Sequence, residues 1–234
     1  MKSLSVSSKV IVVLAFTLTM GSLLIAGFYV PSIEELRENK VESVNYLGNI
    51  YTLESQRYNE HGLNLSASAQ ILASKRILQI LAPGKNVFTR NALLTQGRLA
   101  LIRGLTERRK AISKCIAALD SIDNTSSEYQ SVEAALPLVP IQSITELFAD
   151  FENKSEVIKT MQNHVMTIQN VDEKYEKVWE RIINKLRNEI QKLNLENSAL
   201  SHDISFFLKL ALSFQVLAML LVFLKDFLGE NIKT

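Results

Sequence analysis

Histidine and cysteine are the side chains best suited to bind a metal or to act as nucleophiles, and this chain has few of them. The three histidines are His61, His164 and His202, and the single cysteine is Cys115. A zinc or di-iron site in a helical protein needs ligand pairs such as E-x-x-H that converge from facing helices. The spacing of these residues offers no such pair, and no glycine-rich phosphate loop or G-x-S-x-G turn is present. We therefore expect no metal, no cofactor and no catalytic residue.

Cys115 falls on the apolar face of a predicted helix. A lone cysteine in that position is typical of a small buried apolar residue. An interchain disulfide outside the cytoplasm is the alternative.

Basic residues form the one candidate ligand site. Its members are Lys75, Arg76, Lys85, Arg90 and Arg98. Arginines on two neighbouring helices can hold a carboxylate or a phosphate through paired hydrogen bonds. The alternative is an ordinary solvated basic face. With 26 basic and 24 acidic residues, the chain lacks the excess of positive charge that is typical of nucleic-acid binding.

Two apolar stretches, 10–30 and 206–224, lie near the ends of the chain. At about 1.5 Å per residue, each is long enough to cross a bilayer as a helix. The first exceeds the usual apolar core of a signal peptide, and the bulky run before Pro31 does not suit a cleavage site. We therefore predict two transmembrane helices, with the lipid bilayer as a partner.

Gln215 lies near the middle of the second stretch and is costly in lipid unless it finds a hydrogen-bond partner. Thr17, Thr19 and Ser22 on the first stretch are the candidate partners. The alternative is that the amide has no special role.

The basic residues Lys2, Lys9, Lys225 and Lys233 flank the two stretches on their outer sides. Because positive charge close to a span stays in the cytoplasm, both termini should be cytoplasmic. The expected parts are a cytoplasmic terminus (1–9), the first span (10–30), an extracytoplasmic segment (31–205), the second span (206–224) and a cytoplasmic tail (225–234). The predicted location is the inner, or plasma, membrane.

The segment 31–205 has the 3-4 apolar spacing of long helices, and the whole chain has only 8 Gly and 4 Pro. The S-x-x-E box at Ser32 predicts that a helix restarts after Pro31 and runs to Leu81. A second helix is predicted from Thr89 to Ile122. A third follows a capping box at Thr125, and a turn at 150–155 leads to the last helix. A turn near 170–172 is the alternative, with which the chain closes less well.

The lengths of these helices allow them to run alternately away from the membrane and back towards it, so that the last helix returns to the membrane surface where the first one began. The predicted fold is therefore all-α, with two transmembrane helices flanking an extracytoplasmic antiparallel four-helix bundle. Asp172, Glu189, Glu196 and Asp203 interrupt the apolar seam of the last helix. They indicate either a loosely packed, partly hydrated core or a shift of the heptad frame.

The layout of anchor, helical bundle and anchor resembles the sensory half of bacterial methyl-accepting chemoreceptors and related four-helix-bundle sensors. The short basic start from Lys2 to Lys9 before an apolar span is also similar to theirs. In that family the second span is followed by a HAMP linker and a signalling coiled coil, and the ten residues from 225 to Thr234 contain neither. The resemblance therefore implies signalling through a separate partner. Polysaccharide chain-length regulators share the two anchors but have a proline-rich second span and an α/β base, which are not seen here.

The expected function is a non-enzymatic sensory or accessory subunit that couples the outer bundle to a partner protein. The alternative is a structural scaffold or assembly subunit of a larger membrane complex. Either would associate as a homo-oligomer or with a larger membrane protein, and neither would bind nucleic acid.

Overall fold

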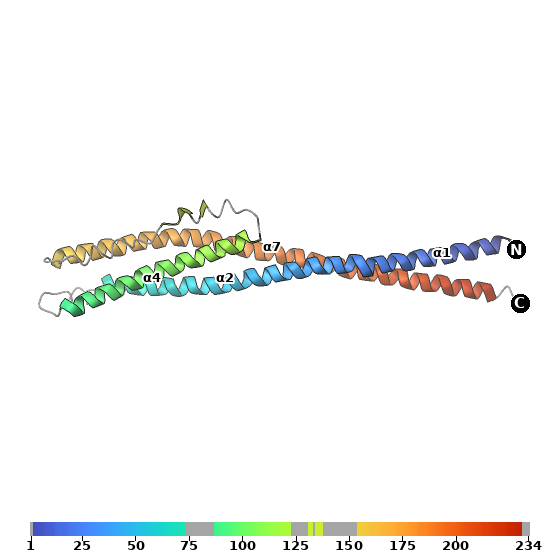
Figure 1. The fold of residues 1–234 in the computed structure, drawn as a ribbon, viewed down its shortest axis with the longest axis horizontal. Helices are drawn as coiled ribbons and strands as arrows, with labels where there is room; N and C mark the ends of the chain where they lie inside the picture. The colour runs from blue at the N-terminus through green and yellow to red at the C-terminus, as the bar shows by residue number, and fades with distance from the viewer. Residues whose placement is uncertain (1, 74–86, 123–130, 133, 138–153, 231–234) are drawn as a thin grey trace. The chain divides into compact units, whose positions relative to one another are not determined.

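The computed structural model of the chain describes residues 2–73, 87–122, 131–132, 134–137 and 154–230. Within these ranges nearly every residue is helical and no strand is present (Figure 1). The all-α prediction is thus confirmed for the described part of the chain.

Four long α-helices and one π-helical segment account for most of the described residues. They are α1 (Lys2–Leu24), η1 (Ile25–Tyr29), α2 (Val30–Ala73), α4 (Val87–Asp120) and α7 (Lys154–Glu230). The second predicted helix agrees with α4 to within two residues at each end. The end of the first predicted helix, at 74–81, lies outside the described residues.

The last helix is one unbroken element from Lys154 to Glu230, so it runs through the whole second apolar stretch. This length follows from a sequence with no proline after Pro140 and no glycine between Gly104 and Gly229. The helix begins inside the predicted turn at 150–155, of which residues 150–153 lie outside the described part. The third predicted helix and its capping box at Thr125 fall mainly on 123–130 and 138–153, which also lie outside it.

The helix restart predicted at Ser32 is wrong. The chain passes from α1 to α2 through η1, where the Val30 N–H donates to the Ile25 carbonyl in the wider i→i−5 pattern. Pro31 follows directly and has no N–H to continue an ordinary i→i−4 ladder. The Ser32 hydroxyl donates back to the Phe28 carbonyl at 2.8 Å instead of capping a new helix.

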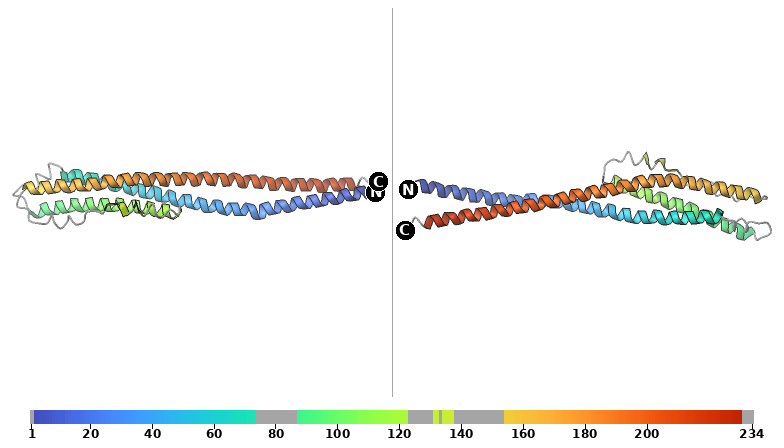
Figure 2. Two further views of the ribbon diagram at one scale, coloured as in Figure 1. Left: turned by 90° about the horizontal axis from the view of Figure 1, so that it is seen from above. Right: turned by 180° about the vertical axis from the view of Figure 1, so that it is seen from behind.

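The chain divides into two compact units, and the first comprises residues 1–44 and 191–234. In it α1 and the start of α2 lie beside the end of α7 in both views of Figure 2. Val30, Ile33 and Ile204 form a buried apolar cluster. Nearby, the Tyr29 and Phe207 rings meet edge to face with centroids 4.6 Å apart.

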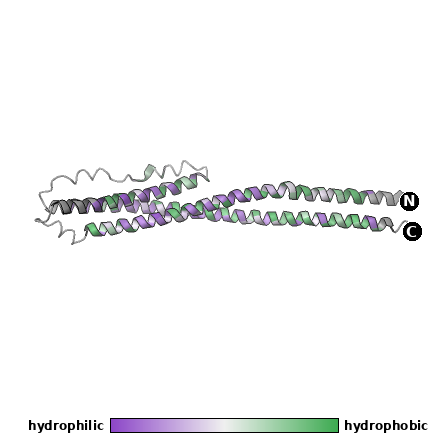
Figure 3. Cartoon of the chain, turned by 60° about the horizontal axis from the view of Figure 1, so that its bottom comes forward, coloured by the Kyte–Doolittle hydropathy of each residue, from purple (hydrophilic) through white to green (hydrophobic). Residues whose placement is uncertain are grey.

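Hydrophobic colouring predominates along α1 and the end of α7 in Figure 3. The most exposed large apolar side chains of this first unit are Val13, Phe16, Leu24, Phe28, Leu195, Leu212, Met219, Phe223 and Phe227. Two helices of the described chain are long and apolar enough to cross a membrane. Small residues instead occupy the buried side of the pair, where Ala15, Ser22, Ala211 and Ala218 lie.

The second unit comprises residues 45–190 and packs parts of α2 and α7 with α4. Its fully buried side chains are mainly aliphatic and aromatic, and they include Leu47, Tyr58, Leu101, Leu105, Ile112, Ile116, Leu119, Ile168, Tyr175 and Leu186. At Gly104 an added Cβ would lie 3.2 Å from the Leu65 side chain, so glycine lets α4 approach α2 closely.

Candidate functional site

A buried arginine at the centre of the second unit connects all three of its long helices. Arg108 on α4 is only 5% exposed, although arginine is rarely buried unless it is paired. Its Nη1 atom donates to the Asp172 carboxylate on α7 in a salt bridge. Its guanidinium carbon lies 3.8 Å from the centroid of the Tyr58 ring on α2.

The Tyr58 ring uses both of its faces. Arg108 covers one face, and Trp179 of α7 stacks on Tyr58 with centroids 4.2 Å apart and planes inclined by 8°. A cation over an aromatic ring contributes about 0.5–2 kcal/mol, depending on how far it is desolvated. We call this group of four residues, Tyr58, Arg108, Asp172 and Trp179, the arginine clasp.

Gly62 makes room for the clasp, one turn along α2 from Tyr58. A Cβ added at Gly62 would lie 3.3 Å from the guanidinium carbon of Arg108. Glycine costs a helix interior roughly 0.5–1 kcal/mol relative to alanine. The clasp supplies the reason for a glycine at this position.

Burial disfavours the ionised form of the carboxyl group in the clasp. Burial raises the pKa of the Asp172 carboxyl, and the neighbouring Arg108 charge lowers it by less; Glu173 and Glu176 raise it further. Burial likewise raises the pKa of Tyr58. A carboxylate whose ionised form is penalised in the folded state is sensitive to any movement that changes its distance from its cationic partner.

A second buried carboxylate lies on α2 one turn before Tyr58. Glu54 is 1% exposed, and its Oε1 accepts from Arg57 Nη1 at 3.0 Å and from Lys114 Nζ at 3.2 Å. Cys115, next to Lys114, is fully buried. Burial, followed by the Glu54 charge, raises the pKa of the Cys115 thiol to about 12. The cysteine is therefore a small buried residue, as one of the two interpretations predicted, and is poorly reactive.

The predicted basic ligand site is described only in part. Lys75, Arg76 and Lys85 lie outside the described residues, and Arg90 lies on α4 where only the backbone is described. Arg98 is buried, at 5% exposed. With only one of the five side chains in the described part of the chain, the structure does not test this site, and a ligand there stays a prediction.

Arg98 lies beside His164 of α7. Burial lowers the pKa of Arg98. Burial, together with the positive charge of Arg98, lowers the pKa of His164 to about 4. Both side chains are thus part of the packed interior of the second unit. His61 is half-buried and His202 is exposed. Within the described ranges, no three His, Cys, Asp or Glu side chains are placed to hold a metal ion.

The predicted contact between the two apolar stretches has one buried member. Ser22 is fully buried, and the described residues provide no hydrogen-bond partner for its Oγ. Thr17 and Thr19 donate to the carbonyls of Val13 and Ala15 in their own helix, each at 2.8 Å. Gln215 is exposed on α7. A hydrogen bond from Gln215 to the first stretch stays a prediction.

The arginine clasp was not predicted from the sequence, although the sequence contains a signal for it. Arg108 continues the apolar spacing of Leu101, Leu105 and Ile112, and Asp172 continues that of Ile168 and Tyr175. Opposite charges at seam positions of two helices indicate a buried ion pair. The position of Asp172 in the seam is real, whereas Asp203 is exposed and its neighbour Ile204 is buried, so there the heptad frame has shifted.

The arginine clasp joins α2, α4 and α7 through one ion pair, one cation–π contact and one aromatic stack, and we interpret it as a contact that links the positions of the three helices. No family model, curated protein or solved structure matches the chain, so this interpretation rests on the geometry alone.

Proposed function

We propose that this protein is a non-enzymatic, membrane-anchored sensory or accessory subunit. Residues 10–30 and 206–224 would span the membrane, 1–9 and 225–234 would be cytoplasmic, and 31–205 would form an extracytoplasmic bundle coupled to a separate partner protein. The observation that carries the proposal is that α2 and α7 each contribute residues to both units without a break in the helix. A movement of α2 or α7 at the clasp would therefore be transmitted to the first unit along a continuous helix.

The arginine clasp supports a sensory role over a passive one. A purely structural core of this size could be entirely aliphatic, and replacing a buried ion pair by apolar residues is often neutral or stabilising. A buried pair with a raised carboxyl pKa instead provides an interaction that a modest change can break.

A fourth element in the bundle is part of the proposal. Leu136, between α4 and α7, is buried. The Tyr175 hydroxyl on α7 donates to the Pro137 carbonyl at 2.6 Å. These contacts support a chain segment packed against α7 in addition to α2 and α4.

The topology is tested by thiol labelling in intact cells. Cys115 is buried with a raised pKa, so the parent chain is expected to remain unlabelled by a membrane-impermeant maleimide. Asn59→Cys, at an exposed site on α2, should be labelled, and Thr234→Cys should be labelled only after the membrane is opened. The reverse pattern would place the bundle in the cytoplasm and refute the topology.

Coupling is tested without knowing the partner. Cysteines at Ser22 and Ala211, both buried in the first unit, would report helix pairing through the rate of disulfide formation in a Cys115→Ala background. Asp172→Asn, in the second unit, should change that rate. Glu173→Gln, the exposed neighbouring carboxylate, is the matched control and should not. Equal rates in the two variants would show that the units are uncoupled, and the scaffold alternative would then be better.

Gln215→Leu tests the contribution of the spans. Hydrogen bonds between transmembrane helices are worth on average about 0.6 kcal/mol, which is too little to hold the fold but enough to bias two arrangements. The variant should leave the stability of the second unit unchanged and alter the Ser22–Ala211 disulfide rate. An unchanged rate would mean that the amide is incidental.

A further inference from the structure

The buried face of the first unit contains a one-residue step in its seam. Along α1 and into η1, the half-buried and buried positions include Ile11, Ala15, Leu18, Ser22 and Ile25, which follow a regular 4-3 alternation, and Gly21 beside Ser22 is also half-buried. Continued in an ordinary α-helix, that alternation would bring residues 29 and 32 into the seam. The residues actually buried are one position later.

On α2 the seam resumes at Val30 and Ile33 and continues through Arg37, Lys40 and Val44. The facing helix has no such step. Along α7 the seam keeps its 4-3 alternation through Leu193, Asn197, Leu200, Ile204, Phe207, Ala211, Phe214, Ala218, Leu221 and Lys225. One extra residue is therefore present on the α1–α2 side only.

The segment η1 lies where the extra residue must be absorbed. A π-turn accommodates one residue more than an α-turn, and an i→i−5 bond joins Val30 to Ile25 here. It keeps Ser22 and Val30 on the same side of the helix. Pro31 offers a competing explanation, because a proline also disrupts the helical ladder at this point.

We infer that η1 is a movable register step that lets α1 adopt two rotational positions against α7. If the π-turn shifts toward the start of α1, the intervening residues turn by about 100° and slide by about 1.5 Å. The seam of α2 then extends backward as an ordinary α-helix through Ala26, Leu23 and Thr19. These positions replace Ile25, Ser22 and Leu18 against α7.

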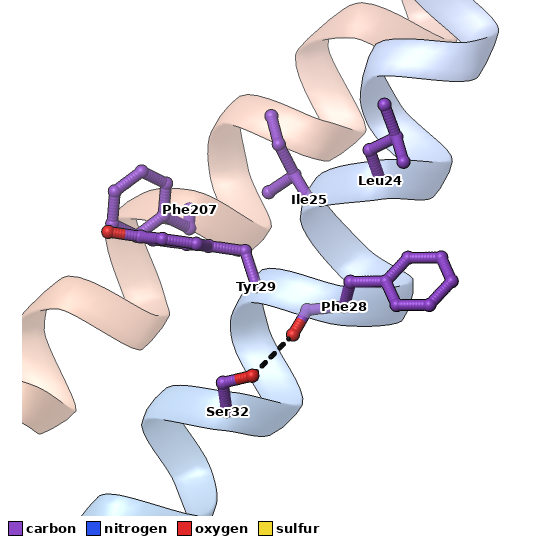
Figure 4. A pocket seen from close by; sticks show the side chains of 6 residues that line it. All are labelled: Leu24, Ile25, Phe28, Tyr29, Ser32 and Phe207. Atoms are coloured by element: carbon purple, nitrogen blue, oxygen red, sulfur yellow. Dashed lines mark hydrogen bonds between the residues drawn. The ribbon is translucent and has the colours of Figure 1, made fainter.

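Two observations support mobility at this point. The outer side of the π-turn is open, because a Cβ added at Gly27 would meet nothing within 4 Å. An open apolar hollow of about 560 Å³ lies beside it. Figure 4 shows the side chains that line this hollow, three of which belong to η1. The hollow is lined by Leu24, Ile25, Phe28, Tyr29, Ser32 and Phe207.

The buried Ser22 hydroxyl is the second observation. Its Oγ is fully buried with no hydrogen-bond partner among the described residues, which penalises the observed register. Rotation of α1 removes Ser22 from the seam and replaces it by Leu23. In the observed register the Leu23 side chain is 55% exposed. The penalty on the observed register brings the second register closer to it in free energy.

The test compares two disulfide pairs in membranes, both in a Cys115→Ala background. The pair Ser22→Cys with Ala211→Cys reports the observed register, and Leu23→Cys with Ala211→Cys reports the rotated one. Each pair is placed in the parent, in Pro31→Ala, and in a variant that combines deletion of Gly27 with Pro31→Ala. The last variant removes the extra residue, so one unbroken α-helix keeps Ser22 and Val30 in a common seam.

In the parent and in Pro31→Ala, both disulfides should form. The Leu23 pair should form at about a tenth to a thousandth of the rate of the Ser22 pair, which corresponds to a minor state of that population. In the deletion variant the Ser22 pair should keep its rate and the Leu23 pair should be lost, and the preserved Ser22 rate shows that the helices still pair.

Two results would overturn the inference. Equal Leu23 rates in the parent and the deletion variant would mean that this disulfide arises from random collisions and that only one register exists. If only the Leu23 disulfide formed in Pro31→Ala, Pro31 would be the sole cause of the π-turn, and η1 would not be a movable register step. The inference concerns the first unit only, so it does not depend on the proposed topology or on coupling to the second unit.

Discussion

Replacing Asp172 by asparagine should destabilise the second unit by leaving a buried arginine without its counter-charge. The side chain of Arg108 is 6% exposed and that of Asp172 is 18% exposed. Removing one partner of a buried ion pair costs about 3–5 kcal/mol. Because water partly reaches Asp172, we expect a loss of about 2–3 kcal/mol in the free energy of unfolding.

The double variant Arg108→Met with Asp172→Leu provides the decisive comparison. It removes both charges together and leaves an apolar side chain of similar length over Tyr58. The raised pKa of Asp172 indicates that its ionised form is already penalised by burial. We therefore expect the double variant to lie within about 1 kcal/mol of the parent, the cost of the lost cation–π contact being offset by the desolvation that is no longer required.

The chain contains its own reporter for this measurement. Trp179 is the single tryptophan and stacks on Tyr58, so its fluorescence follows unfolding of the second unit. Urea titrations of the full chain in detergent micelles give the midpoint and slope for each variant. Glu173→Gln is the control for the loss of one exposed negative charge. An Asp172→Asn stability equal to that of Glu173→Gln, or a double variant as unstable as the single one, would refute the reasoning.

Two further predictions concern other positions of the second unit. Burial lowers the pKa of His164 to about 4, so the unfolded chain takes up a proton before the folded chain does as the pH falls below about 6.5, and the free energy of unfolding should fall by up to about 3 kcal/mol between pH 7 and pH 4. Urea titrations of the parent and of His164→Leu across that range isolate the contribution of the histidine. If the histidine is solvated, the two chains should show the same pH dependence. Gly97→Ala places a Cβ 2.7 Å from Leu72 and should destabilise by about 1–3 kcal/mol. Gly48→Ala meets nothing within 4 Å and should stabilise by about 0.5–1 kcal/mol, so a loss at Gly48 or a gain at Gly97 in thermal unfolding would contradict the packing described here.

The sequence by itself determined that the chain is helical and where its longest helices lie. Scarce glycine and proline and a sustained 3-4 apolar spacing are local properties, and they are enough to predict α4 to within two residues at each end. The same local pattern misplaced the start of α2. A capping box at Ser32 is a valid signal for a free helix end, but the helix does not end there, because η1 connects it to α1.

The tertiary structure decided which charged side chains are buried and which meet. Arg98, a member of the predicted basic ligand site, is buried beside His164, which its charge and its place in the sequence do not reveal. Arg108 and Asp172 lie 64 positions apart in the sequence. Their pairing depends on how α4 and α7 are aligned, and neither helix alone contains that alignment. The one-residue step at η1 depends in the same way on the seams of two helices facing each other. Periodicity specifies a buried face for each helix, whereas only packing specifies what that face contacts.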